Sequence, residues 1–409
     1  MKLFFALAVR NLFRNRLRTA VSLLSIAFGC AALIVNSGIV FNIFRELRED
    51  AIHGRHGHLQ IYRRGYSDGH MMDPERYMIA QSEADQIIRI AQRDPRVMRA
   101  TRRREFTGLA SNGGRQAPFI GIGVEAADDY EFSKHTTLVA GSQLSSKTGY
   151  GILAGKGLAE KLNCHPGDDL SLVSTATSSQ MNSVHVRVEG IFEGGLKEYD
   201  DWTIKVPIPV ANQLLLDDKT EQIVLLLHST AEVKAVEADL QKAFRDDGLD
   251  LEIRTWNQLA LFHNQVVSLF GRELDVIALI VATIVILGIS NAVGMSIVER
   301  RIELATFRAV GVRPRALAAL LVTESGFAGV IGALIGVLFA IGIARVATAV
   351  GIPYPSPPGS TRPFRGGIDL AISTLFNSFI ISVAATMAAA LLPTWRAVRV
   401  SIADTLRKS

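Results

Sequence analysis

The chain has 409 residues, of which 48% are hydrophobic and only 20% are charged. This balance is unusual for a soluble protein, so membrane-spanning segments are the first feature to look for. The formal net charge of +5 does not come from one basic patch, and nucleic-acid binding therefore has little support.

Four stretches are long enough and poor enough in charge to cross a membrane, which takes roughly 20 residues. They lie between Arg18 and Arg45, between Asp275 and Glu299, between Arg315 and Arg345 with Glu324 as one interruption, and between Asp369 and Arg396. We predict spans over residues 18–44, 274–298, 316–345 and 370–392. A signal peptide is the alternative for the first stretch, but its apolar run continues to Phe41, well beyond the length of such a peptide.

Basic residues near the ends of spans mark the cytoplasmic side, because they resist translocation. The first 18 residues contain Lys2, Arg10, Arg14, Arg16 and Arg18 and no acidic residue, and segments 299–315 and 393–409 are also rich in arginine. Both termini are therefore predicted to be cytoplasmic. The recurrence of arginine every fourth residue, opposite apolar positions, favours a helix on the inner membrane surface over residues 1–17; the alternative is a plain charged anchor.

Residues 45–273 are predicted to form a large extracytoplasmic domain, and residues 346–369 a short extracytoplasmic loop. The stretch from Arg45 to Asp275 carries 34 acidic and 27 basic residues. Strand-like patterns lie at 58–62, 119–124, 184–188, 223–227 and 251–253, and helical patterns at 82–92, 157–162 and 232–244. Together they predict an α+β domain inserted between the first two spans.

Apolar residues continue at helical spacing past the first span to Leu47, and again from Leu259 into the second span. We therefore predict that both helices extend as a stalk for the domain. Two flexible linkers are the alternative, but neither junction contains proline or a Gly/Ser run.

No pattern in the sequence predicts catalysis. Residues 151–157 resemble a phosphate-binding loop, but the spacing is wrong and Gly157 stands where the magnesium-binding hydroxyl belongs. His53, His56 and His58 are a weak candidate for a metal site, and a solvated entry to a strand is the favoured interpretation because no cysteine or carboxylate cluster follows. We predict no catalytic residue, no metal ligand and no cofactor bound by this chain.

The spans also contain small and polar residues that need neighbours. A stripe of four glycines lies on one face of the third predicted helix, where a helix of this chain or of a partner can approach closely: Gly326, Gly329, Gly332 and Gly336. Glu324 should face protein, water or a basic residue, because a charge in contact with lipid is costly. It is either a gating or coupling contact or a structural hydrogen bond, and Asn291 in the second span allows the same two interpretations.

The loop after the second span carries the most distinctive segment. It reads Glu299-Arg300-Arg301-Ile302-Glu303-Leu304-Ala305-Thr306-Phe307-Arg308-Ala309-Val310-Gly311 and predicts a short charged helix with a glycine stop. It resembles the corresponding segment of the FtsX-like permease superfamily, the membrane subunits of MacB- and LolC/LolE-type ABC transporters. Residues 8–16, 393–399 and 403–407 resemble the start and the end of these proteins, and residues 155–162, 167–170 and 190–200 resemble their extracytoplasmic signatures.

The resemblance covers essentially the whole chain and implies a partnership. The protein would act as a dimer with a second permease subunit, identical or paralogous, bound to two copies of a cytoplasmic ABC ATPase that holds ATP and magnesium. The implied coupling residues are Glu299, Arg300, Arg301, Glu303, Leu304, Phe307, Arg308 and Gly311. Thr306 and Phe307 replace a small-aliphatic pair of the family, which leaves the exact partner contact open.

The resemblance also implies a substrate that is handled outside the membrane. Release of lipoproteins, as in LolC/LolE-type members, is favoured by residues 192–200; MacB-type efflux with a periplasmic adaptor and FtsX-like control of a cell-wall hydrolase are the alternatives. The implied location is the inner membrane, with the large domain in the periplasm. Membrane lipid is an expected partner and nucleic acid is not.

Overall fold

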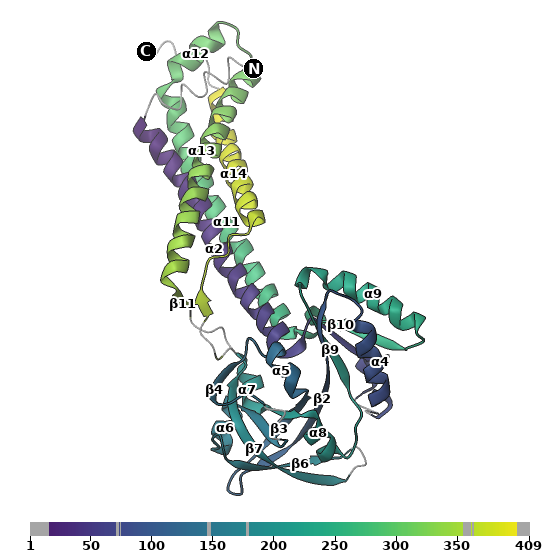
Figure 1. Ribbon diagram of the computed structural model, residues 1–409. Helices are drawn as coiled ribbons and strands as arrows, with labels where there is room; N and C mark the ends of the chain where they lie inside the picture. Colours follow the sequence, from purple (N-terminus) through teal and green to yellow (C-terminus); the bar gives the residue numbers. More distant parts are fainter. Residues whose placement is uncertain are drawn as a thin grey trace. The chain divides into compact units, whose positions relative to one another are not determined.

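A computed structural model describes residues 16–70, 73, 75–144, 149–176, 180–354, 361 and 364–398 (Figure 1). It divides into two compact units. The helical unit comprises residues 1–44, 267–354 and 365–409, and the sheet unit comprises residues 45–266 and 355–364. The predicted surface helix over residues 1–17 lies almost entirely outside the described residues, as does the predicted tail from residue 399 onward.

Four long helices contain the apolar spans: α2 (Arg16–Ala51), α11 (Leu261–Glu299), α13 (Pro314–Val350) and α14 (Ile372–Val398). Each is long and apolar enough to cross a membrane, which confirms the four-span fold class. Both α2 and α11 are helical beyond the predicted spans, because no proline interrupts either junction. Two short strands, β11 (Ile352–Tyr354) and β12 (Phe364–Gly366), pair between α13 and α14.

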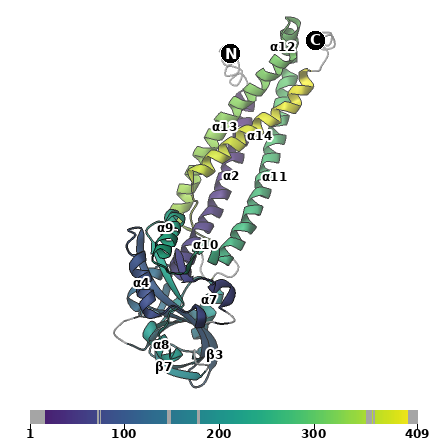
Figure 2. The same ribbon diagram turned by 90° about the vertical axis from the view of Figure 1, so that its right-hand side faces the viewer.

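The glycines of α13 bring neighbouring helices into close contact. A Cβ atom at Gly336 would lie 2.6 Å from the backbone oxygen of Ala27, and one at Gly332 would lie 2.8 Å from Cβ of Ile26, both on α2. At Gly329 the nearest atom, 3.1 Å away, belongs to Thr386 of α14, and Gly326 faces Met387 of the same helix. The stripe therefore serves helices of this chain, and Figures 1 and 2 both show α13 beside α14.

The sheet unit is built on ten described strands in one mixed sheet with the order β10-β1-β9-β2-β3-β8-β5-β7-β4, while β6 pairs with β2 and β7. Most pairs are antiparallel, and β3–β8 and β5–β7 are parallel. The strands are β1 (Leu59–Arg63), β2 (Val97–Ser111), β3 (Gln116–Val124), β4 (Thr137–Gly141), β5 (Gly151–Gly155), β6 (Asp169–Thr175), β7 (Met181–Glu193), β8 (Thr203–Pro207), β9 (Gln222–Leu227) and β10 (Leu251–Thr255).

Helices cover this sheet and complete its cores. In Figure 1, α4 (Gln81–Ala91) and α9 (Val233–Asp246) lie beside β9 and β10, and their apolar faces bury Ile87, Val236 and Phe244 against Leu225. The smaller helices are α3 (Tyr66–Gly69), α5 (Ala126–Phe132), α6 (Lys156–Leu162), α7 (Lys197–Trp202), α8 (Ile208–Leu215) and α10 (Trp256–Leu259), with a π-helical turn, η1 (Ile52–His56), after α2 and 3-10 turns at Glu75–Tyr77 and Thr230–Glu232. The α+β domain between the first two spans is thus confirmed.

Strands with an alternating apolar pattern were predictable, whereas β2 was not. It contains three consecutive arginines, and Arg103 and Arg104 are only 5% and 3% exposed. Their guanidinium groups donate hydrogen bonds to backbone oxygens of Arg55, Asp217 and Lys219. Since these acceptors come from distant parts of the chain, the local pattern hides the strand. Residues 151–155, which resemble a phosphate loop, are a buried strand instead.

Candidate functional site

The charged segment after α11 folds as α12 (Arg301–Ala309), shorter than the predicted helix over residues 299–311. Glu299 ends α11, and Arg300 leaves the helical region of backbone angles with φ −102° and ψ 18°. At the other end Gly311 has φ +97°, a conformation that favours glycine, and Pro314 begins α13. The backbone therefore turns sharply on both sides of α12.

One face of α12 packs onto the helical unit. Leu304 and Ala305 are 7% and 6% exposed, and Leu304 contacts a cluster formed by Ile297, Leu317, Leu320 and Leu321. Burying a leucine side chain contributes about 1.5–3 kcal/mol to stability. This contact therefore fixes how α12 is positioned and rotated against α11 and α13. Leu304 is thus placed as a structural residue rather than a surface one.

The opposite face of α12 is exposed and largely apolar. Ile302, Phe307 and Val310 have exposed fractions of 57%, 39% and 81%, and Arg301 and Thr306 are exposed beside them. Glu303 and Arg308 are half-buried at the edges. The coupling residues that the resemblance implies do not include Ile302 and Val310, although their spacing with Thr306 follows one helical face. An apolar strip bordered by charge is suited to binding another protein.

Glu324 of α13 reaches the start of α12 through an ion pair. The guanidinium of Arg300 donates hydrogen bonds at 3.1 and 3.2 Å to the two carboxylate oxygens of Glu324, and at 3.2 Å to Glu303. The side chains of Arg300 and Glu324 are only 13% and 17% exposed. Glu324 therefore has the basic partner that its position requires, and the pair ties the third span to the residue that precedes α12.

Asn291 has a different environment. It lines a cavity of about 630 Å³ in the helical unit, together with Ser290 from α11 and Leu304 and Arg308 from α12. Arg300 and Asn291 thus lie at the same end of the helical unit, next to α12.

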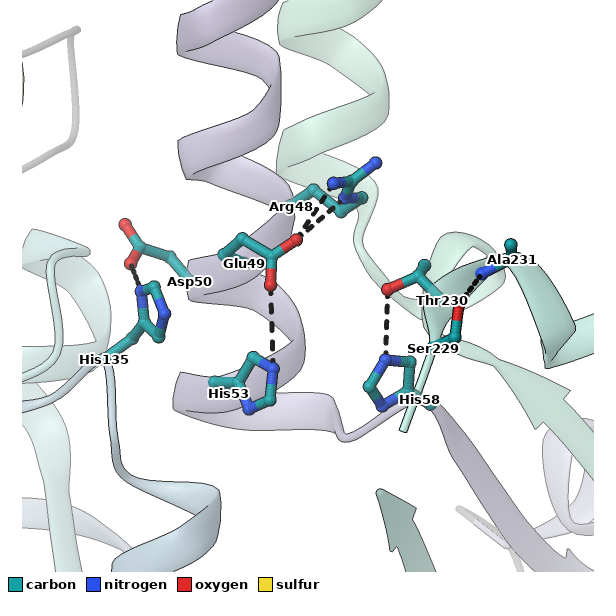
Figure 3. Close-up of polar contacts among 9 residues, drawn as sticks. All are labelled: Arg48, Glu49, Asp50, His53, His58, His135, Ser229, Thr230 and Ala231. Atoms are coloured by element: carbon teal, nitrogen blue, oxygen red, sulfur yellow. Dashed lines mark hydrogen bonds and ion pairs between the residues drawn. The ribbon is translucent and has the colours of Figure 1, made fainter. Parts of the chain in front are cut away.

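The histidines at the end of α2 form a polar cluster rather than a solvated strand entry, so that interpretation is wrong. His58 is 2% exposed. Its Nδ1 accepts a hydrogen bond from the Leu227 amide at 3.1 Å. This leaves Nε2 to donate to Thr230 at 3.1 Å, the contact drawn in Figure 3. Both ring nitrogens are used, so His58 is not available to a metal. Among the described residues no group of three metal-ligating side chains is assembled.

Burial also sets the charge of this cluster. Desolvation, together with the nearby His53, lowers the pKa of His58 to about 4. Nε2 of His53 lies 3.6 Å from a carboxylate oxygen of Glu49, and burial lowers the pKa of His53 as well. The ring of His135 stacks on His53, and the hydrogen bond to Asp50 raises the pKa of His135 (Figure 3).

A buried neutral His58 predicts that acid destabilises the sheet unit. The native pKa of about 4 lies below the unfolded value of about 6.5, so the unfolded state binds a proton first as the pH falls. Stability should fall by about 1.4 kcal/mol per pH unit between those values. Glutamine can accept and donate hydrogen bonds like the neutral ring. In His58→Gln the loss of unfolding free energy between about pH 7.5 and pH 5 should therefore be smaller than in the wild type by about 2 kcal/mol. Thermal unfolding of the full chain at both pH values measures this.

The matched control for that measurement is His165→Gln, because the side chain of His165 is 75% exposed. It should keep the pH dependence of the wild type. A pH dependence that is equal in His58→Gln and the wild type would contradict the assignment.

Two family models match the sequence in tandem. One described as MacB-like periplasmic core domain matches residues 19–243, more than half of the chain. The other, described as FtsX-like permease C-terminal, matches residues 276–402 and so includes α12, Glu324 and the glycine stripe.

Individual relatives agree with these matches. The lipoprotein-releasing system transmembrane protein LolC of Xylella fastidiosa (strain Temecula1) is 24% identical over 403 residues, which cover 94% of this chain and 92% of that protein. An uncharacterised ABC transporter permease of Methanocaldococcus jannaschii is 30% identical over 172 residues, 40% of this chain and 42% of the relative.

Two solved structures are also similar. The extracellular domain of the transporter YknZ from Gram-positive bacteria has 11% identity and a TM-score of 0.35, and covers 48% of this chain and 99% of its own. The periplasmic region of MacB from Actinobacillus actinomycetemcomitans has 13% identity and a TM-score of 0.37. The match covers 51% of this chain and 93% of that structure.

Proposed function

Because this chain belongs to the family of ABC transporter permeases that join a MacB-like periplasmic core domain to an FtsX-like permease domain, we propose that it converts ATP hydrolysis by a partner subunit into movement outside the membrane. In this family the permease and the ATPase are separate subunits, and membership implies a dimeric permease. We propose that ATP and magnesium are held by the partner, and that both termini of this chain are cytoplasmic in the inner membrane.

The proposal rests on how α12 is held against the helical unit. Its inner face is fixed by Leu304 and by the Arg300–Glu324 ion pair, while Ile302, Phe307 and Val310 remain exposed on the outer face. A helix held in this way transmits a force on its outer face to α13. The ion pair makes this connection, because it joins Arg300, the residue before α12, to Glu324 of α13. The outer face would receive the ATPase.

Co-purification of the ATPase tests this proposal. The chain and its ATPase are expressed together, and the double variant Phe307→Ser/Val310→Ser is compared with the wild type in detergent. Loss of two apolar contacts should reduce ATPase activity in the eluate at least about tenfold, which corresponds to 1.4 kcal/mol.

The control is Leu216→Ser, since Leu216 is 58% exposed in the sheet unit. It should retain the ATPase in full, and all variants should unfold at the wild-type temperature. An ATPase that stays bound to the double variant would place the contact elsewhere, and one that never accompanies the wild type would overturn the transporter proposal.

We further propose that the substrate is a lipoprotein released from the inner membrane. Support comes from the similarity to LolC, which extends over 94% of this chain. The reconstituted complex should release a triacylated protein, but not its unacylated form, to a soluble acceptor when ATP is added. Release of neither form, with ATP-dependent export of a small apolar compound instead, would favour efflux.

A further inference from the structure

The cavity of about 630 Å³ in the helical unit is lined mostly by apolar side chains, with the polar Ser290 and Asn291 of α11 among them. Its walls come from α11, α12, α13 and α14, and include Leu287, Met295, Leu304, Leu317 and Leu392. Gly294 and Pro393 bring α11 and α14 close together within it, since a Cβ at Gly294 would lie 4.0 Å from Cβ of Pro393. Its volume falls in the range of small-molecule sites, about 300–1,000 Å³.

Three arginines line the same cavity: Arg301 and Arg308 on α12 and Arg396 on α14. No carboxylate is among its described lining residues. Arg300, which lies next in sequence to Arg301, does not line the cavity and pairs with Glu303 and Glu324. Arg301 and Arg396 are exposed, so the positive charge is accessible from outside.

The apolar walls extend farther along the helices than the charge does. Leu287 precedes Glu299, the last residue of α11, by 12 residues, which is about 18 Å at the rise of an α-helix. The arginines lie beside α12, where the spans α11 and α13 end, and Leu287 lies within the span of α11. A ligand that fills the cavity must therefore carry negative charge at one end and a hydrocarbon chain at the other.

The cavity is also open toward the surroundings of the helices. Leu287, Met295 and Leu392 line it and are 65%, 59% and 53% exposed. In a bilayer such side chains face lipid, so a lipid molecule can enter sideways without opening the protein. A soluble anion would satisfy the arginines but not the apolar wall, and an apolar helix would satisfy the wall but not the arginines.

We propose that this cavity binds one anionic phospholipid of the inner leaflet, with its phosphate at Arg301 and Arg396 and an acyl chain along Met295 and Leu287. Basic pockets between spans on the cytoplasmic side suit such head groups. The bound lipid would contact both α12 and α14 and so connect these two helices. This goes beyond the proposed function, because the site is complete without an ATPase.

Native mass spectrometry of the full chain in detergent tests the site without any partner. Phosphatidylglycerol and phosphatidylcholine with identical acyl chains are added at equal concentration. The wild type should retain one phosphatidylglycerol with at least a tenfold preference, and Arg301→Gln/Arg396→Gln should lose that preference. The matched control is Arg313→Gln/Arg315→Gln, which removes the same charge from exposed positions that do not line the cavity.

A second pair of variants tests the apolar part. Gly294→Leu fills the cavity and should abolish retention of the lipid, whereas Gly288→Leu on the same helix, outside the cavity and with nothing within 4 Å, should not. Equal loss of preference in both arginine pairs would overturn the proposal in favour of diffuse attraction. Displacement of the lipid by glycerol phosphate would show that the cavity binds an anion and not a lipid. Loss of a dimer, rather than of lipid, in Gly294→Leu would show that a second copy of the chain occupies the cavity.

Discussion

Replacing Gly336 with alanine should lower the free energy of unfolding of the full chain by about 3 kcal/mol. The new Cβ would lie 2.6 Å from the Ala27 oxygen and 2.8 Å from Cβ of Cys30, and the first of these is backbone. Neither a rotamer change nor a small side-chain movement relieves such a contact. Helices α2 and α13 must separate, which removes close packing along their whole interface. Equilibrium unfolding in mixed micelles measures the loss.

The same helix supplies a control of identical chemistry. Gly342→Ala adds a methyl group where nothing lies within 4 Å, and alanine is the better helix former by about 1 kcal/mol. This variant should therefore be neutral or slightly stabilising. If Gly336→Ala and Gly342→Ala have equal stability, α2 and α13 do not approach at Gly336.

The Arg300–Glu324 ion pair carries the second large effect. Removing one member of a poorly exposed pair leaves an uncompensated charge and costs about 3–5 kcal/mol at full burial. The side chains are 13% and 17% exposed, so about 2–3 kcal/mol is expected here. Arg300→Met should cost more than Glu324→Gln, because Arg300 keeps Glu303 as a partner in the second variant whereas Glu324 loses the Arg300 guanidinium in the first.

A double-mutant cycle isolates this pair. Arg300→Met/Glu324→Gln should be less destabilised than the sum of the single variants, with a coupling energy of about 1–2 kcal/mol. Arg315→Met is the control, since Arg315 is exposed on the same helix as Glu324 and does not line the cavity. ATPase activity measured in the complex should fall with the single variants and recover in part with the double. Additive effects on stability would show that the two side chains act independently.

Several features of this protein follow from local sequence alone. The four spans are set by long intervals without charge, because each charged residue in hydrocarbon is costly whatever surrounds it. The segment before α13 is identifiable in the same way, from its charges, Gly311 and Pro314. The strands β3, β7 and β9 follow from alternation or from β-branched runs, since these patterns depend on neighbours within one strand.

Other features depend on residues far apart in the chain. Lys205 is buried, and its Nζ lies 3.2 Å from Oδ1 of Asp129 and 2.6 Å from Oγ of Ser133. The residues near Lys205 in sequence do not predict either partner. Burial lowers the pKa of Lys205, and Asp129 opposes that shift. The same holds for His58, whose acceptor and donor roles are decided by Leu227 and Thr230.

The sequence by itself determined the membrane class, the inserted α+β domain and the family resemblance, because hydropathy, charge and motif spacing are properties of short segments. Only the tertiary structure decided that Arg300 is the partner of Glu324, that Leu304 faces inward while Ile302 and Val310 face outward, and that three arginines of α12 and α14 meet at one cavity. These outcomes depend on which helix packs against which, and that choice is made by contacts between segments that the sequence keeps apart.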